Sequence, residues 1–156
     1  MAALSAGLLV FRRGTDGSPE VLLVHPGGPF WSRRDAGAWS IPKGEVEQGE
    51  ALSEVAEREF IEELGRPAPS GPRTDLGEIV QSGGKRVRAW AVEGDFDPSG
   101  ITSNLFEMEW PPRSGRRQSF PEVDRAAWFT LAVAREKLIP AQVELLARLP
   151  ALGDPT

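Results

Sequence analysis

Residues 44–65 read GEVEQGEALSEVAEREFIEELG, and the glutamates of this stretch are not spread evenly around a helix. Projected at about 100° per residue, its apolar residues share one face: Leu52, Val55, Ala56 and Phe60. Glu59 and Glu63 fall in the same apolar sector, and Glu62 flanks it. The pattern therefore predicts a helix that turns two or three carboxylates toward its own core-facing side.

Carboxylates on the core-facing side of a helix need compensation. An isolated buried carboxylate is costly, and like charges a few ångströms apart raise each other's pKa. Either some of these glutamates hold a proton, or a divalent cation lies among them, because Mg²⁺ and Mn²⁺ prefer oxygen ligands. A third interpretation is a solvated acidic helix. The helical phase alone leaves these three interpretations open.

The spacing within the stretch narrows the choice. It runs Gly, five residues, Glu, seven residues, then Arg-Glu-apolar-x-Glu-Glu-x-Gly. The residues that meet this pattern are Gly44, Glu50, Arg58, Glu59, Phe60, Glu62, Glu63 and Gly65. The stretch resembles the Nudix box of the Nudix hydrolases. Arg66 departs from the family, which usually has an aliphatic residue there, and this affects how the helix exit packs but no metal ligand.

The resemblance implies a fold and a reaction. The fold class is α/β, with residues 1–156 forming a single Nudix domain, an α/β/α sandwich around a mixed central sheet. The reaction is hydrolysis of a phosphoanhydride bond in a nucleoside diphosphate linked to another group X, with Mg²⁺ or Mn²⁺ as the cofactor. The partner it implies is a small-molecule nucleotide.

Four substrate classes or functions follow from the resemblance, in order of preference. A dinucleoside polyphosphate such as diadenosine tetraphosphate comes first, because a lysine precedes the box glycine as in that branch of the family. Nucleoside triphosphates and ADP-ribose are the next alternatives, since specificity lies in loops outside the box. A nucleotide-sensing Nudix domain without catalysis is the alternative from another class, although all three box glutamates are present.

The resemblance also assigns roles within the box. Glu59 and Glu63 would be metal ligands, and the backbone carbonyl of Lys43, just before the box, would complete the inner site. Glu62 would be either a ligand or the base that activates water. A carboxylate close to a metal ion is a reasonable base where the geometry allows.

Two further residues receive catalytic roles by resemblance. Arg58 would orient the box glutamates through charge-assisted pairs, with Glu50 as one partner. The simpler interpretation is a plain i,i+4 ion pair, worth about a few tenths of a kcal/mol. Outside the box, Glu122 precedes Trp128 by a few residues, and a glutamate at that place in Nudix enzymes often completes the metal site or acts as the base. Asp124 is the alternative to Glu122.

The remaining candidates are substrate contacts: Lys43, Lys85, Arg113, Arg116, Arg117 and Trp31. The two lysines can meet phosphate as point charges, and dinucleoside polyphosphate hydrolases of this family carry a basic residue at the place of Lys85. The arginines gather in residues 111–118, where a mobile loop beside a metal site would suit polyphosphate. Trp31 could stack on a base. Solvated side chains, and for Trp31 a cover over the core edge, are the alternatives.

Composition sets further bounds. The chain has 156 residues, 40% hydrophobic and 26% charged, as expected for one globular domain with a proper core. Its net charge of −5 argues against nucleic acid as a bulk partner. The absence of cysteine excludes disulfides and thiol catalysis, and a lone His25 excludes a multi-histidine zinc cage within one chain.

The sequence also bears on location. Residues 1–5 lack the basic region of a signal peptide, and no apolar run approaches the roughly 18 residues of a membrane span. We therefore expect a cytoplasmic protein with no membrane partner. The sequence leaves the oligomeric state open.

Hydrophobic periodicity and turn residues predict the order of the elements. The predicted strands are residues 6–12, 20–25, 39–43, 76–81, 85–93, 104–110 and 126–129. Residues 44–49 are a predicted loop, followed by a helix from about 51 to 64 that ends at Gly65. Residues 111–118 are predicted to be irregular, and Thr130 and Pro140 to begin two helices. Residues 153–156 are predicted to form a frayed tail.

Overall fold

In the computed structural model, which describes residues 3–153, strand β1 (Leu4–Arg13) lies at the centre of the sheet. It is buried without interruption from Ser5 to Phe11. Such a continuous run belongs to a strand that is covered on both faces. β1 pairs in parallel with β5 (Arg86–Glu93) and antiparallel with β2 (Pro19–Pro26) and β3 (Lys43–Glu45), so the sheet is mixed.

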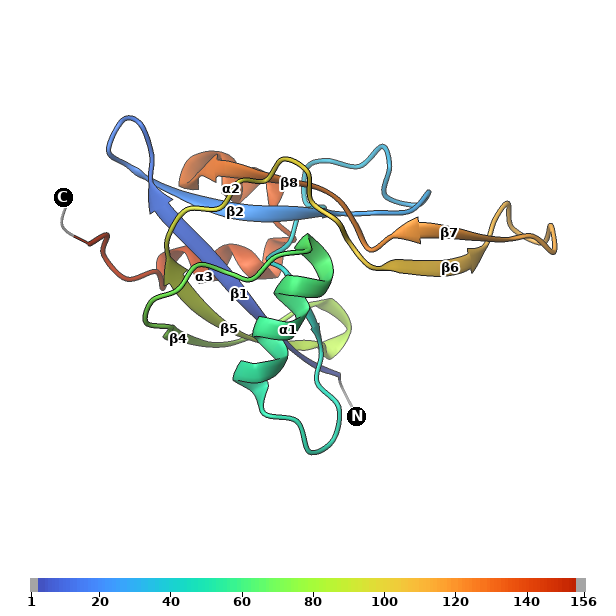
Figure 1. The fold of residues 1–156 in the computed structure, drawn as a ribbon, viewed down its shortest axis with the longest axis horizontal. Coiled ribbons are helices and arrows are strands. Elements are labelled where there is room, and N and C mark those ends of the chain that lie inside the picture. The colour runs from blue at the N-terminus through green and yellow to red at the C-terminus, as the bar shows by residue number, and fades with distance from the viewer. Residues whose placement is uncertain (1–2, 154–156) are drawn as a thin grey trace.

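The sheet has the order β4-β5-β1-β2-β8, with β3 paired to the start of β1 (Figure 1). Its outer strands are β4 (Thr74–Val80) and β8 (Val123–Thr130). A separate two-stranded ribbon, β6 (Leu105–Glu109) with β7 (Arg117–Pro121), projects from the body of the domain. We call this ribbon and the turn between its strands the arm (residues 105–121).

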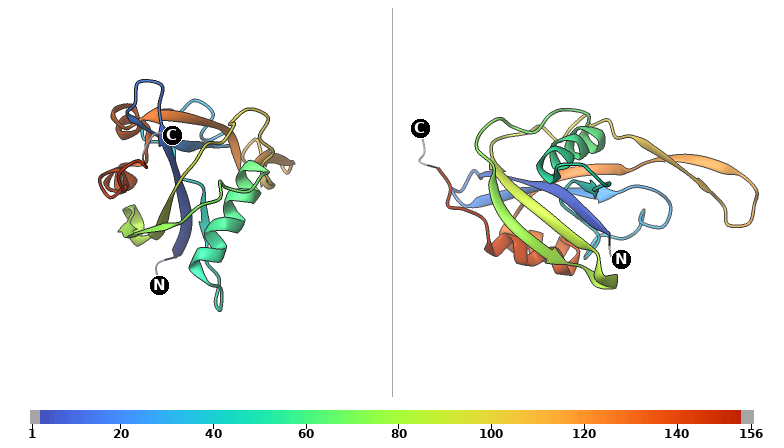
Figure 2. Two further views of the ribbon diagram at one scale, coloured as in Figure 1. Left: turned by 60° about the vertical axis from the view of Figure 1, so that its left-hand side comes forward. Right: turned by 90° about the horizontal axis from the view of Figure 1, so that it is seen from below.

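Helices cover both faces of the sheet (Figure 2). α1 (Leu52–Leu64) packs on one face, in a core cluster with alternate residues of β1 such as Leu8 and Val10. The opposite face carries α2 (Leu131–Lys137), the 3₁₀ turn η2 (Pro140–Gln142) and α3 (Val143–Ala147), which border the other cluster. A second 3₁₀ turn, η1 (Ser82–Gly84), connects β4 to β5 and has no buried residue. The predicted α/β/α sandwich around a mixed sheet is therefore confirmed.

Both ends of α1 agree with the sequence. Ala51 is its N-cap and offers no side-chain hydrogen bond, so the helix depends on packing for its stability. Gly65 ends it with a φ of 83°, a left-handed conformation that glycine adopts without strain. Between them, the helical phase places Phe60 in the core, fully buried and edge-on to Phe96 at 5.2 Å between ring centroids.

Four predicted boundaries were wrong, because pairing with distant strands decides the structure. Gly44 and Glu45 belong to β3 rather than to a loop, since they pair with Ala6 and Ser5. Of the predicted strand 39–43, Trp39 and Ser40 form isolated bridges and only Lys43 belongs to a strand, β3. Arg117 lies in β7 rather than in an irregular loop, and β8 begins at Val123, earlier than predicted.

The ends of the described chain add two observations. The backbone N–H of Gly153 donates to Glu93, and its carbonyl accepts from Arg13. The rest of the predicted frayed tail, residues 154–156, lies outside the described residues. Across residues 3–153, no helix has both the length and the apolar character needed to cross a membrane.

The packing of α1 gives a first prediction. Phe60→Ala should lower the free energy of unfolding by about 3–5 kcal/mol, because it removes a buried ring and leaves a cavity. Ile61, its neighbour on the same helix, is 45% exposed, so Ile61→Ala should cost less than about 1 kcal/mol. Urea denaturation of both variants measures this, and equal losses would contradict the described helical phase.

Candidate active site

The acidic face of α1 rests against β3, and one glycine makes this possible. A Cβ atom added at Gly44 would lie 2.0 Å from the carboxyl carbon of Glu59 and 2.3 Å from both of its oxygens. No other residue type leaves room for the carboxylate there. The first glycine of the predicted box therefore acts through its missing side chain, by letting Glu59 approach the backbone of β3.

Arg58 brings the acidic residues of the box together. Its guanidinium donates a hydrogen bond to Glu50, and it lies 3.7 Å from a carboxylate oxygen of Glu59 and 3.7 Å from one of Glu62. Glu50 is fixed in turn by the backbone N–H of Glu47 at 2.8 Å. Because the Arg58 side chain is 45% exposed, these pairs contribute little to stability. Their effect is to hold the orientation of the carboxylates.

Two of these carboxylates, Glu63 and Glu59, are removed from water without enough positive charge nearby to offset the loss of hydration. Desolvation, with the charge of Glu59 second, raises the pKa of Glu63 to about 9, and Lys43 offsets only part of the rise. Desolvation and the charge of Glu62 raise the pKa of Glu59 to about 7. The side chain of Glu63 is buried, with 8% of the residue exposed. In this state the site holds protons that a cation could replace.

Glu122 reaches the same place from the other end of the chain. The backbone N–H of Asn104 donates to the carbonyl of Glu62 at 2.8 Å, and the N–H of Glu122 donates to the carbonyl of Asn104 at 2.8 Å. The carbonyl of Glu122 accepts from the N–H of Gly27 at 2.9 Å. Desolvation, followed by the charge of Glu62, raises the pKa of Glu122. The root of the arm is thus joined to the acidic helix by backbone hydrogen bonds.

A cavity of about 190 Å³ opens beside these carboxylates and is lined by Trp31, Lys43, Glu63 and Glu122 among others. Desolvation lowers the pKa of Lys43, although the nearby glutamates oppose this. The volume is below the roughly 300–1,000 Å³ of pockets that enclose a drug-sized ligand. The cavity therefore fits one part of a nucleotide, with an aromatic ring, an ammonium group and carboxylates on its walls.

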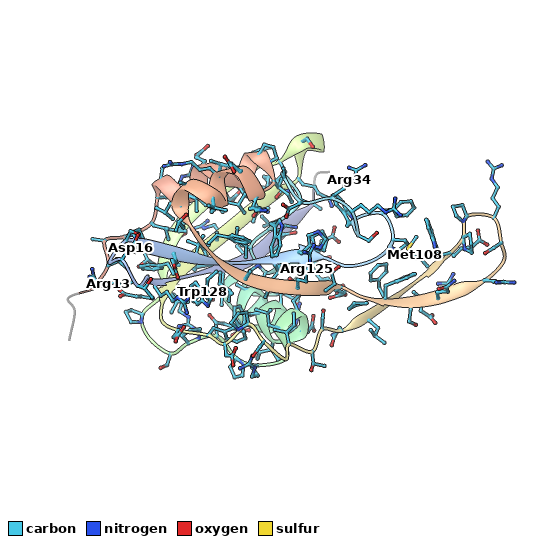
Figure 3. The ribbon with its side chains drawn as sticks, turned by 90° about the horizontal axis from the view of Figure 1, so that it is seen from above. Arg13, Asp16, Arg34, Met108, Arg125 and Trp128 are labelled. Atoms are coloured by element: carbon cyan, nitrogen blue, oxygen red, sulfur yellow. The ribbon has the colours of Figure 1, made fainter. Side chains whose placement is uncertain are left out.

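The predicted arginines lie elsewhere. Arg113 and Arg116 are in the turn at the tip of the arm and Arg117 begins β7, and all three are exposed. The arm extends beyond the body of the domain, away from α1 (Figure 1), with Met108 on its outer part (Figure 3). The structure therefore does not bring the arginine loop beside the acidic helix. Lys85, by contrast, is close enough to Lys43 for its charge to act on that lysine.

A family model described as the NUDIX domain matches residues 1–149. The chain belongs to the NUDIX family. Among curated proteins, the 8-oxo-(d)GTP phosphatase of Mycolicibacterium smegmatis is 34% identical over 122 residues, or 69% of this chain. The match covers 34% of that protein, so the chain spans about a third of its relative's length.

Two solved structures show the same NUDIX fold. The Ap4A hydrolase of C. elegans, in a binary complex, has a TM-score of 0.64 at 21% identity, covering 92% of this chain and 93% of that chain. The NUDIX domain of Shewanella oneidensis NrtR, crystallised with ADP ribose, has a TM-score of 0.63 at 17% identity, covering 95% of this chain and 86% of that one. Identities this low establish the fold alone.

NUDIX hydrolases generally use divalent metal ions, and the donor set of this chain fits such an ion. Glu59, Glu63 and Glu122 supply hard carboxylate oxygens, which Mg²⁺ and Mn²⁺ prefer. Their raised pKa values show that their negative charge lacks a full counterion. Within residues 3–153, however, no three acidic, histidine or cysteine side chains lie close enough together to hold a metal ion. The carboxylates repel one another, so we expect a cation to draw them together.

A larger cavity, about 710 Å³, lies along β8 rather than at the carboxylates. Its charged groups are paired: Asp35 binds Lys137, and Arg125 lies 3.6 Å from Asp124. Asp124 also binds the buried ring of His25 at 2.8 Å. Because the carboxylate of Asp124 is already paired with His25 and Arg125, Asp124 is a poor alternative to Glu122.

Sequence reasoning missed the contributions of Gly27 and Asn104. Both act through backbone groups that connect α1, Glu122 and the loop carrying Trp31. Every residue except proline has a backbone N–H group, so a single sequence does not show which of these groups will form a functional hydrogen bond. Only Glu122, with a charged side chain and a fixed place relative to Trp128, gave a signal that could be read.

The buried carboxylates predict how stability changes with pH when EDTA removes divalent cations. The folded protein keeps protons on Glu63 and Glu59 that the unfolded chain releases near pH 4.5. Because the unfolded chain then binds fewer protons, the free energy of unfolding should fall as pH rises from about 5 to about 9. Chemical denaturation at several pH values measures this. Glu63→Gln should flatten the fall, and an unchanged slope would contradict the buried state of Glu63.

Proposed function

We propose that this NUDIX domain hydrolyses a phosphoanhydride bond of a nucleoside polyphosphate with the help of Mg²⁺ or Mn²⁺. The observation that carries the proposal is that Glu63 and Glu122 line one cavity with Trp31 and Lys43, and that the charges of Glu59 and Glu122 both act on Glu63. Residues from α1, β3, the root of the arm and the loop after β2 meet there. A site for structure alone would not place under-compensated carboxylates beside an accessible cavity.

Different residues would bind the cation, orient its ligands and contact the phosphate. Glu59 and Glu63, with the backbone carbonyl of Lys43, would hold the cation, which when bound neutralises phosphate charge, polarises the phosphoryl group and acidifies water. Arg58 orients the carboxylates of Glu59 and Glu62 through its ion pairs with them. The ammonium group of Lys43 lies on the cavity wall, where it would meet a phosphate oxygen.

Two residues are candidates for the base that takes the proton from the attacking water. Glu122 lines the cavity and has a raised pKa, which suits a base that works near neutral pH. Glu62 lies beside Arg58 and is not among the residues that line the cavity. We therefore assign the base to Glu122 and treat Glu62 as a further cation ligand. Glu122→Gln should then lower kcat by about 10²–10⁴-fold.

A purine nucleoside triphosphate, oxidised purines included, is the substrate class that we propose first. The support is the 34% identity to an 8-oxo-(d)GTP phosphatase over most of this chain. Trp31 would stack on the base at the mouth of the cavity. A dinucleoside polyphosphate is the second candidate. The lysine before the box glycine and the proximity of Lys85 to Lys43 favour a dinucleoside polyphosphate. The arginines at the tip of the arm do not support it, because the arm extends away from α1.

A substrate panel tests the proposal. The panel contains 8-oxo-dGTP, dGTP, ATP, diadenosine tetraphosphate and ADP-ribose, each with Mg²⁺ or Mn²⁺, with products separated by chromatography. We expect triphosphates to be hydrolysed faster than the others. Preference for diadenosine tetraphosphate would select the second candidate, and nucleotide binding without turnover of any compound would show a sensor instead of an enzyme.

Variants of α1 connect the turnover to the carboxylates. Millimolar Mg²⁺ should raise the melting temperature of the wild type, because it binds the folded state. Glu63→Gln should lose this rise and most of the turnover while remaining folded. Glu54→Gln is the matched control, since Glu54 is an exposed glutamate of the same helix. Full activity in Glu63→Gln would rule out the proposed cation site.

A further inference from the structure

Gln142 is a fully buried polar residue, and both the oxygen and the nitrogen of its side-chain amide form hydrogen bonds. It lies at the end of η2 with 0% of its surface exposed. Its carbonyl oxygen accepts from the backbone N–H of Ile41 at 3.0 Å. Its amide nitrogen donates to the hydroxyl of Ser40 at 2.9 Å and to the side-chain oxygen of Gln81 at 2.9 Å. One side chain therefore joins three segments of the chain.

Each segment that Gln142 holds leads to a lysine of the proposed site. Ser40 and Ile41 come just before Lys43, which follows in β3. Gln81 closes the turn between β4 and β5, because its backbone N–H binds the carbonyl of Lys85 at 2.7 Å. Gln142 thus spans from the Lys43 segment to the turn that carries Lys85.

The two segments differ in how firmly they are otherwise held. Ser40 exchanges backbone hydrogen bonds with Val24, and Lys43 pairs with Gly7 in the sheet. The turn of residues 81–85 lies at the edge of the sheet, next to Val80, which is exposed. Among the described residues, Gln142 is the side chain that donates a hydrogen bond into this turn. Lys85 is also restrained from its other side, where the backbone N–H of Arg86 donates to the carbonyl of Ala3 at 2.9 Å, so Gln142 adds the side-chain restraint on the turn that carries Lys85.

We propose that Gln142 is a positioning residue that fixes the spacing between Lys43 and Lys85, so that both ammonium groups receive one phosphate chain. The inference rests on the proposed function, since it concerns the polyphosphate of the same substrate. A chain of two or more phosphates can contact both lysines, whereas a single phosphate can contact one. Because the spacing between Lys43 and Lys85 is set before the ligand binds, binding does not have to pay the entropic cost of ordering the turn. Gln142 touches neither substrate nor cation and acts through the two segments.

Binding of inorganic phosphates in EDTA tests this without the cation. Orthophosphate and tripolyphosphate are the probes, measured by calorimetry. Lys85→Ala should weaken tripolyphosphate binding about tenfold or more, as expected for a lost charged contact. Gln142→Leu should weaken it similarly and change orthophosphate binding little. In the double variant, the loss should be smaller than the product of the two single losses, because both remove one function.

Two controls separate positioning from folding. Gln81→Leu breaks only the bond into the turn and leaves Gln142 bonded to Ser40 and Ile41, so it should reproduce the tripolyphosphate loss even if Gln142→Leu is unstable. Gln118→Leu is a matched control on the arm, where Gln118 donates to the carbonyl of Trp110 at 2.8 Å. It should leave both affinities unchanged.

The outcomes distinguish this inference from the proposed function. Multiplicative losses in the double variant, or equal losses for orthophosphate and tripolyphosphate, would overturn the role of Gln142 even if the wild type hydrolyses nucleotides. Coupled losses confined to tripolyphosphate would establish that role. Coupled losses in a protein that hydrolyses nothing on the substrate panel would leave Gln142 as a positioning residue and overturn hydrolysis.

Discussion

The burial of Glu59 and Glu63 between α1 and β3 is the constraint on which the rest of the site depends. Two carboxylates in that position are unfavourable unless a proton or a cation compensates them. The surroundings supply only part of this compensation, through Arg58 and Lys43. Gly44 then has to lack a side chain, because the Glu59 carboxylate occupies the space beside it. These carboxylates therefore cost stability in the absence of a cation, which is the physical basis of the proposed cation site.

The sheet provides the rigid frame for this arrangement. β1 holds β3 along the start of one edge and β5 along the other, so Lys43 and the strand that follows Lys85 are fixed to one strand. Gln142 connects the remaining loops from the opposite face of the sheet. Core residues such as Phe60 hold α1 on its own face. Phe60 and the proposed cation ligands Glu59 and Glu63 lie in the same core-facing sector of α1, so packing and the proposed chemistry share one side of the helix.

Local patterns predicted much of this protein. The helical phase of residues 52–64 placed Glu63 in the same sector as Phe60, although it left a solvated acidic helix open, and Gly65 marked the end of the helix. Wherever a distant partner decides the outcome, local patterns were insufficient. Gly44 was predicted to lie in a loop but pairs with Ala6 of β1. Arg117 was predicted to lie in an irregular loop but pairs with Glu109 of β6. The arginines were expected near the acidic helix because a sequence does not reveal that an arm carries them away.

Proton release on cation binding tests the central claim most directly. Titrating Mg²⁺ into the protein at pH 7, in buffers of different ionisation enthalpy, gives the number of protons released. With the pKa of Glu63 raised to about 9 and that of Glu59 to about 7, the account predicts release of at least about one proton per cation, and less in Glu63→Gln. Cation binding with no proton release would contradict it, because the carboxylates would then already be ionised and compensated.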